Sequence, residues 1–116
     1  MPEPPRPWLD AVEVRGDSMA PGLQPGDRLL IESRSLRRRV PRSGEIVVAA
    51  DPREPSRELV KRVASVDEAA GLVLLAGDAH EASTDSRTFG ALPLAAVRWR
   101  AVARYWPLRR ARFLRS

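Results

Sequence analysis

The stretch Arg15-Gly16-Asp17-Ser18-Met19-Ala20-Pro21 directly follows a short apolar segment at residues 11–14. A connection rich in proline and glycine comes after it. This pattern predicts a short strand that ends in a tight turn, because glycine supplies the backbone freedom that such a turn needs. The turn aims the hydroxyl of Ser18 outwards, and we expect the rest of the chain to be organised around it.

Five further segments have the apolar pattern of β-strands and are separated by turn residues. They are residues 27–33, 45–50, 59–66, 71–76 and 97–106. We find no amphipathic helix of convincing length. The sequence therefore predicts an all-β protein, a small single-domain β-barrel-like fold of about six strands.

The length of 116 residues fits one small domain. The proline-rich start predicts a disordered lead-in at residues 1–10, before a β domain at residues 11–107 and a basic tail at residues 108–116. The chain has no cysteine, which excludes thiol catalysis, disulfides and thiolate metal sites. No apolar run approaches the ~20 residues of a membrane-spanning helix, and no secretory signal is present, so we expect a location in the cytoplasm, either free or peripheral to the membrane.

The formal charge of +5 and the pI near 11.1 favour contact with an anionic surface, either nucleic acid or acidic lipid headgroups. A general compositional bias towards arginine explains the same numbers equally well. Four arginines surround Phe113 and Leu114 in the tail. We expect either a frayed basic end or a peripheral contact with an anionic membrane through this C-terminal tail.

Lys61 is the only lysine among 20 basic Lys and Arg residues. In a strand with a period of two, Leu59, Lys61 and Val63 share one face, so aliphatic side chains flank the amine. Such desolvation lowers the pKa of a lysine towards the range of a general base, whereas an arginine cannot lose its proton. The alternative is a lysine that extends to solvent at a strand edge. A serine on a turn and one titratable amine suggest a Ser/Lys hydrolase.

Other chemistries find weaker support. A Ser/His/Asp triad would need His80, the only histidine, and no pattern connects it to a nucleophile. A metal site built from Asp78, His80, Glu81 and Asp85 has loose spacing and is more typical of a solvated loop. We therefore expect no metal and no other cofactor.

Four short motifs, in this order, resemble the conserved boxes of the type I signal peptidase family. They are Ser18-Met19-Ala20-Pro21, then Gly26-Asp27, then Val60-Lys61-Arg62-Val63, and finally Gly77-Asp78 with Ser83-Thr84-Asp85-Ser86-Arg87. The resemblance covers approximately residues 12–107. It implies the β fold shared by the catalytic cores of signal peptidases and LexA-type repressors.

The resemblance also assigns roles to individual residues. It implies that Ser18 is the nucleophile, that Lys61 is the general base, and that Ser83 helps to hold the lysine. Asp78, Asp85 and Arg87 match positions that structure the site in the family.

The turn itself matches the region that forms the oxyanion hole, at Gly16, Asp17 and Ser18. Bacterial signal peptidases carry a hydroxyl two residues before the nucleophile, and Gly16 lacks one. An oxyanion hole here would therefore rely on backbone donors, including the N–H of Ser18, and one lost donor costs about 10² to 10³ in rate.

The family likeness implies a serine endopeptidase that removes an N-terminal leader or signal segment after a small residue, through an acyl-enzyme. Its partner would be a protein or peptide substrate rather than nucleic acid. The housekeeping enzymes carry a membrane anchor and a large extra β-region that we do not find here. In this respect the chain resembles the peptidases found beside nickel superoxide dismutase, which trim a leader from that enzyme.

A second hypothesis is a non-catalytic or self-cleaving basic β-module that binds nucleic acid or a partner protein. LexA-type repressors also carry such a serine and lysine. However, no helix-turn-helix segment precedes residue 11, and aromatic residues for base stacking are few. A peptidase with an intact Ser/Lys pair but a degraded oxyanion hole is a third hypothesis.

Overall fold

The structure, a computed structural model, describes residues 7–79 and 90–114. Its strands are β1 (Leu9–Glu13), β2 (Arg28–Glu32), β3 (Ile46–Asp51), β4 (Glu54–Asp67), β5 (Leu72–Ala76), β6 (Leu92–Pro93), β7 (Val97–Trp106) and β8 (Arg112–Phe113). Three single turns of 3₁₀ helix are η1 (Ser35–Arg37), η2 (Leu94–Ala96) and η3 (Leu108–Arg110). No α-helix occurs within the described ranges, so the prediction of an all-β fold is confirmed.

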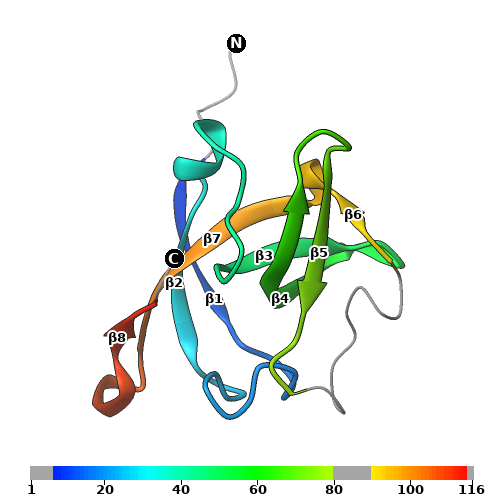
Figure 1. Cartoon of the computed structure of the whole chain (residues 1–116). Helices are drawn as coiled ribbons and strands as arrows, with labels where there is room; N and C mark the ends of the chain where they lie inside the picture. Colours follow the sequence, from blue (N-terminus) through cyan, green and yellow to red (C-terminus); the bar gives the residue numbers. More distant parts are fainter. Residues whose placement is uncertain (1–6, 80–89, 115–116) are drawn as a thin grey trace.

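All eight strands belong to one antiparallel sheet, in the order β1-β2-β7-β3-β4-β5-β6, with β8 paired to β7 (Figure 1). The sheet is not closed, because β1 and β6 at its two ends do not pair with each other in the described part of the chain. The end strands are short, with five and two residues. The structure adds two details to the confirmed all-β prediction: the barrel-like sheet is open, and its described residues form eight strands where about six were expected.

Strand β4 is longer than the sequence predicted. The sequence predicted a strand that begins at residue 59, but residues 54–58 form the first part of β4 and extend the hairpin with β3. The buried carboxylate of Asp51 stabilises the connection, since it accepts hydrogen bonds from the backbone and the guanidinium of Arg53 at 2.8–3.1 Å. The polar composition of this segment reflects its exposure and not the absence of a strand.

Both ends of the predicted domain extend further than expected. Leu9 and Asp10 are the first residues of β1, although the sequence placed them in the lead-in. At the other end, residues 112–113 pair with β7, and the N–H of Leu114 donates to the carbonyl of Val102 at 2.8 Å. The side chain of Leu114 packs against the core. Part of the predicted tail is thus attached to the sheet.

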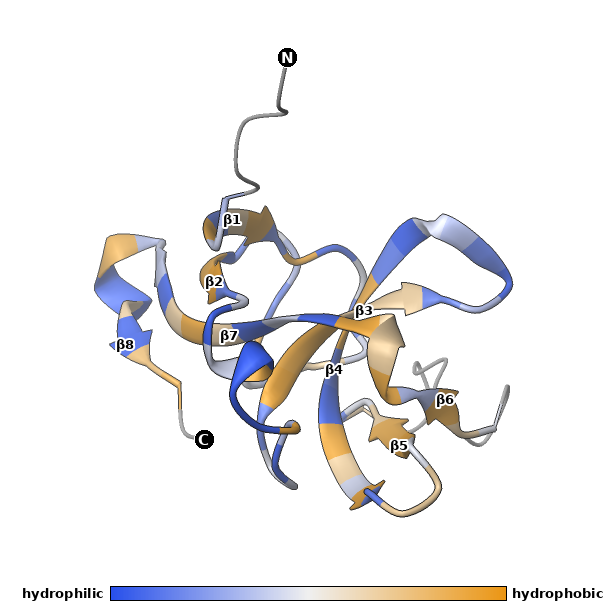
Figure 2. Ribbon diagram, turned by 90° about the horizontal axis from the view of Figure 1, so that it is seen from above, coloured by the Kyte–Doolittle hydropathy of each residue, from blue (hydrophilic) through white to orange (hydrophobic). Residues whose placement is uncertain are grey.

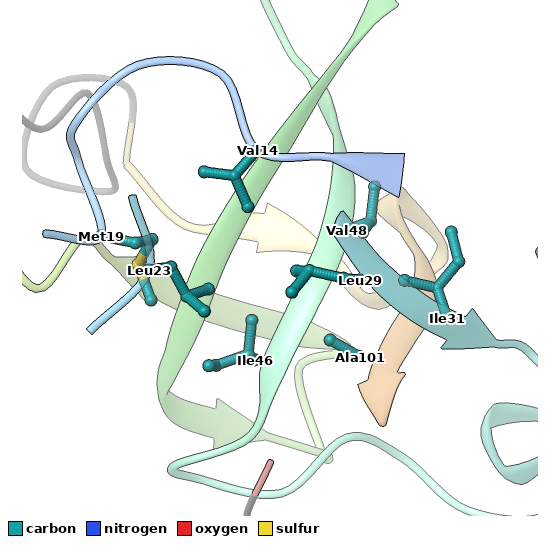
Figure 3. Packing of buried hydrophobic residues seen from close by; sticks show 8 residues of the cluster. All are labelled: Val14, Met19, Leu23, Leu29, Ile31, Ile46, Val48 and Ala101. Atoms are coloured by element: carbon teal, nitrogen blue, oxygen red, sulfur yellow. The ribbon is translucent and has the colours of Figure 1, made fainter. Parts of the chain in front are cut away.

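Strand β3 is buried on both faces and divides the core into two clusters. Val48 and Ile46 belong to the cluster that also receives residues from β2 and from the serine turn, which we define as residues 15–27 (Figure 3). Val47 and Ala49 belong to the second cluster, with residues of β4, β5 and β7. The first cluster is the one that supports the turn with Ser18.

Glu45, directly before β3, carries a fully buried carboxylate. Burial alone raises its pKa, but hydrogen bonds from Arg39 at 2.8–2.9 Å and from the N–H of Arg42 at 2.6 Å outweigh burial and hold the pKa below its usual range. A carboxylate with a lowered pKa in the folded state stabilises the protein above its unfolded pKa of about 4.3. This stabilisation is lost as the pH falls through the folded pKa.

We therefore expect the free energy of unfolding to decrease between pH 7 and pH 3, and Glu45→Gln to reduce this decrease. At pH 7 the same change should destabilise the protein by about 2 kcal/mol, because it removes charge-assisted hydrogen bonds to Arg39. Urea denaturation at a series of pH values measures both effects. Glu68→Gln, at an exposed turn position, is the matched control. A variant with the same pH dependence as wild type would contradict the assignment.

Candidate active site

The serine turn is built on a glycine and closed by backbone hydrogen bonds. Gly16 has a φ of +78°, a conformation that side chains with a Cβ rarely adopt. The N–H of Val14 donates to the carbonyl of Asp27 at 2.7 Å, and the N–H of Gly26 donates back to Val14 at 2.9 Å, so the two ends of the loop are held together. Within the turn, the N–H of Ala20 donates to Asp17 at 3.0 Å.

Hydrophobic anchors fix the turn to the core on either side of the serine. Met19 and Leu23 are 1% and 2% exposed, and Figure 3 shows them beside Val14 and Ile46 in the first core cluster. Ser18 itself is half-buried. Because its neighbour Met19 points into the core, the backbone of the serine has a defined position rather than that of a free loop.

A buried charge network connects the serine turn to the far end of the chain. Asp27 is 2% exposed and accepts hydrogen bonds from the N–H of Gln24 at 2.9 Å, from Arg110 at 2.8 Å and from Arg104 at 3.4 Å. Arg104, on β7, is 5% exposed and also donates to the carbonyls of Gly22 and Arg110. Burial and the neighbouring charge of Arg110 lower the pKa of Arg104. The network holds the turn against β7.

Lys61 lies in β4 and is 2% exposed. It is opposite Val47 of the central strand β3, and Val63, two residues further along β4, is 1% exposed. The prediction that this lysine lies among aliphatic side chains agrees with the structure. Burial of an amine in such surroundings disfavours its charged form.

One groove brings the serine turn and the lysine together. Its volume is about 740 Å³. Ser18 and Lys61 both line it, as do Gly16 and Asp17. One wall is the segment 11–19 and the other is Arg53 with residues 56–61. The sequence-predicted pair and turn therefore share one concave site.

Unpaired strand edges border the groove. In the described residues, β1 pairs only with β2, so its other edge has no strand partner. Residues 58–61 of β4 pair with β3, whereas pairing with β5 begins at Arg62. Within the part of the chain that the structure describes, the second edge of residues 58–60 is therefore also without a strand. Unpaired edges can hold an extended peptide by backbone hydrogen bonds.

The segment after β5 returns to the serine. The N–H of Ala79 donates to the carbonyl of Ser18 at 2.8 Å. Asp78 forms a two-pronged ion pair with Arg62, at 2.8 and 3.0 Å, and Arg62 also donates to the carbonyl of Gly44. The hydrogen bond to Asp78 is the main cause of a raised pKa of Arg62. Asp78 thus lies where it can position the segment that follows it.

Three other predicted site residues, Ser83, Asp85 and Arg87, lie outside the described residues. Conversely, sequence reasoning gave no role to Arg62 or to Asp27. Both belong to the four motifs given above. Arg62 directly follows Lys61, and Asp27 directly follows Gly26. The signal was thus present in the sequence, but their partners lie 16 to 83 residues away, and only the structure identifies them.

The described residues contain neither a membrane-spanning helix nor a cluster of metal ligands. Across residues 7–79 and 90–114, no helix is long and apolar enough to cross a membrane. In the same part of the chain, no group of three or more His, Asp or Glu side chains has the arrangement to hold a metal ion.

The chain is similar to known proteases. Residues 7–68 match the family described as "Signal peptidase, peptidase S26". The mitochondrial ATP-independent inner membrane protease subunit 1b of Arabidopsis thaliana is 35% identical over 113 residues, which covers 79% of this chain and 67% of the relative. The human mitochondrial inner membrane protease subunit 1 is 31% identical over 123 residues, which covers 90% and 74%. The chain therefore belongs to the peptidase S26 family, that of the type I signal peptidases, and it is a peptidase.

Proposed function

We propose that the protein is a serine endopeptidase with a Ser/Lys dyad, in which Ser18 is the nucleophile and Lys61 is the general base. The observation that carries the proposal is that one groove is lined by a serine on an anchored turn and by a lysine that is 2% exposed. A buried amine can exist in its neutral form near neutral pH, and a neutral amine can accept a proton.

In the proposed reaction, neutral Lys61 accepts the hydroxyl proton of Ser18 as the Ser18 oxygen attacks the carbonyl carbon of the substrate. The ammonium of Lys61 then returns the proton to the leaving amine, and an acyl-enzyme remains. Lys61 next takes a proton from water, which attacks the ester and releases Ser18. Ser83 would orient the amine in both steps.

The remaining residues would structure the site. Asp78, with its ion pair to Arg62, would hold the start of the segment that carries Ser83, Asp85 and Arg87. Gly16 and Asp17 would shape the turn. The N–H of Ser18 donates no hydrogen bond to any described residue, which supports its role as an oxyanion donor.

We infer that the substrate is a protein or peptide in extended conformation, which adds as a strand between β1 and residues 58–60 of β4. The two edges that have no strand partner among the described residues, on both sides of the groove, support this mode of binding. The product would be a chain freed of an N-terminal leader or signal segment. The narrower link to nickel superoxide dismutase stays a prediction, since the relatives described above carry other names.

The cleaved peptide bond would directly follow a small residue of the substrate. We expect peptides with alanine before the scissile bond to be cleaved at least about 100-fold faster, in kcat/KM, than otherwise identical peptides with phenylalanine there, because an oversized side chain displaces the carbonyl from the nucleophile. Mass spectrometry of the products measures both the rate and the cleaved bond. Equal rates for the two peptides would rule out the small-residue specificity, and no cleavage of any peptide in a broad library would count against the peptidase mechanism.

The names of the relatives assign those proteins to the mitochondrial inner membrane. We therefore propose that this peptidase acts on substrates presented at a membrane surface, which agrees with the peripheral alternative of the sequence prediction and not with a location free in the cytoplasm.

A further inference from the structure

The C-terminal hairpin, which we define as residues 106–113, exposes large apolar side chains. Trp106 is 45% exposed, Leu108 is 74% exposed and Phe113 is 83% exposed. Figure 1 shows η3 and β8 at the end of β7, where the hairpin projects beside β2. Leu108 and Phe113 are the most exposed large hydrophobic residues of the described chain. Such exposure on a soluble surface marks a site of contact.

Arginines alternate with these apolar residues. Arg109 and Arg112 of the hairpin are exposed, and so is Arg28 of the neighbouring strand β2. The guanidinium carbon of Arg28 lies 5.6 Å from the centre of the Trp106 ring, and the two residues are partners in the β2–β7 register. Figure 2 shows hydrophobic and hydrophilic residues in succession along this part of the chain. The hairpin thus combines apolar side chains with cations.

The hairpin also contacts the serine turn. Arg110 donates to Asp27 at 2.8 Å, to the side-chain oxygen of Gln24 at 3.3 Å and to the carbonyl of Gly22 at 3.3 Å. These three residues belong to the turn that carries Ser18. Arg110 therefore links the hairpin, and any surface to which the hairpin binds, to the turn that carries the nucleophile.

We propose that the C-terminal hairpin docks the protein on an anionic lipid bilayer. Trp106, Leu108 and Phe113 enter the boundary between headgroups and acyl chains, while Arg28, Arg109 and Arg112 bind the headgroup phosphates. Interleaved aromatic, aliphatic and basic residues are the pattern of interfacial membrane binding, and the chain has a net charge of +5. An exposed aliphatic residue such as Leu108 favours lipid over nucleic acid, which offers phosphates but no apolar interior.

The docking proposal rests on the proposed function in one respect only. Docking would serve the peptidase by bringing the groove to substrates at the membrane. Sedimentation of the full chain with vesicles tests docking without any cleavage. Cleavage of soluble peptides without vesicle binding would overturn docking alone. Vesicle binding without cleavage would leave docking in place and would count against the Ser/Lys peptidase.

The experiment compares vesicles of pure phosphatidylcholine with vesicles that contain about 30% phosphatidylglycerol, at low and high salt. We expect binding to the anionic vesicles that weakens as salt increases. Leu108→Ser combined with Phe113→Ser should reduce the partition coefficient at least about tenfold. Arg109→Gln and Arg112→Gln should each reduce it about fivefold.

Matched controls are available elsewhere on the surface. Leu74, which is 42% exposed on β5, can be changed to serine, and the exposed Arg37 and Arg38 can be changed to glutamine. We expect vesicle binding by these controls at the level of wild type. Equal binding by hairpin and control variants would overturn the proposal. So would a dimer in solution, or DNA binding at the same salt, that only the hairpin variants lose, because the hairpin would then serve a second copy or a nucleic acid.

Discussion

Replacement of Ser18 by alanine, or of Lys61 by arginine, is expected to reduce kcat for peptide cleavage by at least about 10³-fold. The first change removes the attacking oxygen. The second keeps a positive charge in β4 but removes the amine that can become neutral, because a guanidinium does not lose its proton in a protein. Rates with a cleavable peptide, measured by mass spectrometry, give the effect directly.

Ser65→Ala is the matched control for the nucleophile, since Ser65 is an exposed serine of the same strand as Lys61 and does not line the groove. It should retain the rate of wild type. Circular dichroism of each variant separates loss of chemistry from loss of fold. If the arginine variant retains more than about a tenth of the wild-type rate, the role of Lys61 as base is wrong. Such a rate is far above the residual activity expected when the nucleophile or the base is disabled.

The pH profile of wild type is a second readout of the same mechanism. Activity should rise with pH as Lys61 loses its proton, because only the neutral amine can accept the proton of Ser18. A constant rate from acid to alkali would contradict this role. If Lys61 had only a structural role, the cleavage rate would not rise with pH in this way.

Replacement of Asp27 by alanine is expected to reduce the free energy of unfolding by about 3–5 kcal/mol. Asp27 is 2% exposed and Arg104 is 5% exposed, so the change leaves a buried guanidinium without its carboxylate. It also removes the ion pair with Arg110 and the hydrogen bond from the N–H of Gln24. Burial already lowers the pKa of Arg104, which indicates that its charge is costly at this position.

Urea denaturation measures this effect, with Asp67→Ala as the control, since Asp67 is an exposed aspartate whose carboxylate accepts only one hydrogen bond in the described chain. The control should cost less than about 1 kcal/mol. In a chain that already carries Arg104→Met, Asp27→Ala should cost much less than in wild type, because the unpaired charge is gone. Equal costs in the two backgrounds would show that the two residues do not act together.

Several features of the protein were accessible from sequence because they depend on neighbouring residues. Apolar runs bounded by turn residues predicted the strands around residues 27–33, 45–50 and 71–76, and Gly16 predicted the turn. The surroundings of Lys61 followed from the residues two positions away on each side. In each case, the geometry of a strand or a turn converts spacing along the chain directly into position.

The polarity of the sequence was a poor guide at positions where the exposure of a residue does not indicate whether it belongs to a strand or has a buried partner. Residues 54–58 are polar because they are exposed, and yet they form part of β4. Arg104 belongs to a row of arginines in β7 and had no predicted partner, but it is buried against Asp27, 77 residues away. A sequence pattern reports the character of a residue and not the partner that makes its burial favourable.

By itself, the sequence determined the all-β class, the serine on its turn, the lysine among aliphatic residues and the order of the motifs. Only the tertiary structure decided that β7 lies between β2 and β3, that the sheet stays open, and that unpaired edges of β1 and β4 border a groove lined by Ser18 and Lys61. The physical reason is that strand formation follows from local periodicity, whereas strand order and buried ion pairs depend on the packing of segments that are distant in the chain.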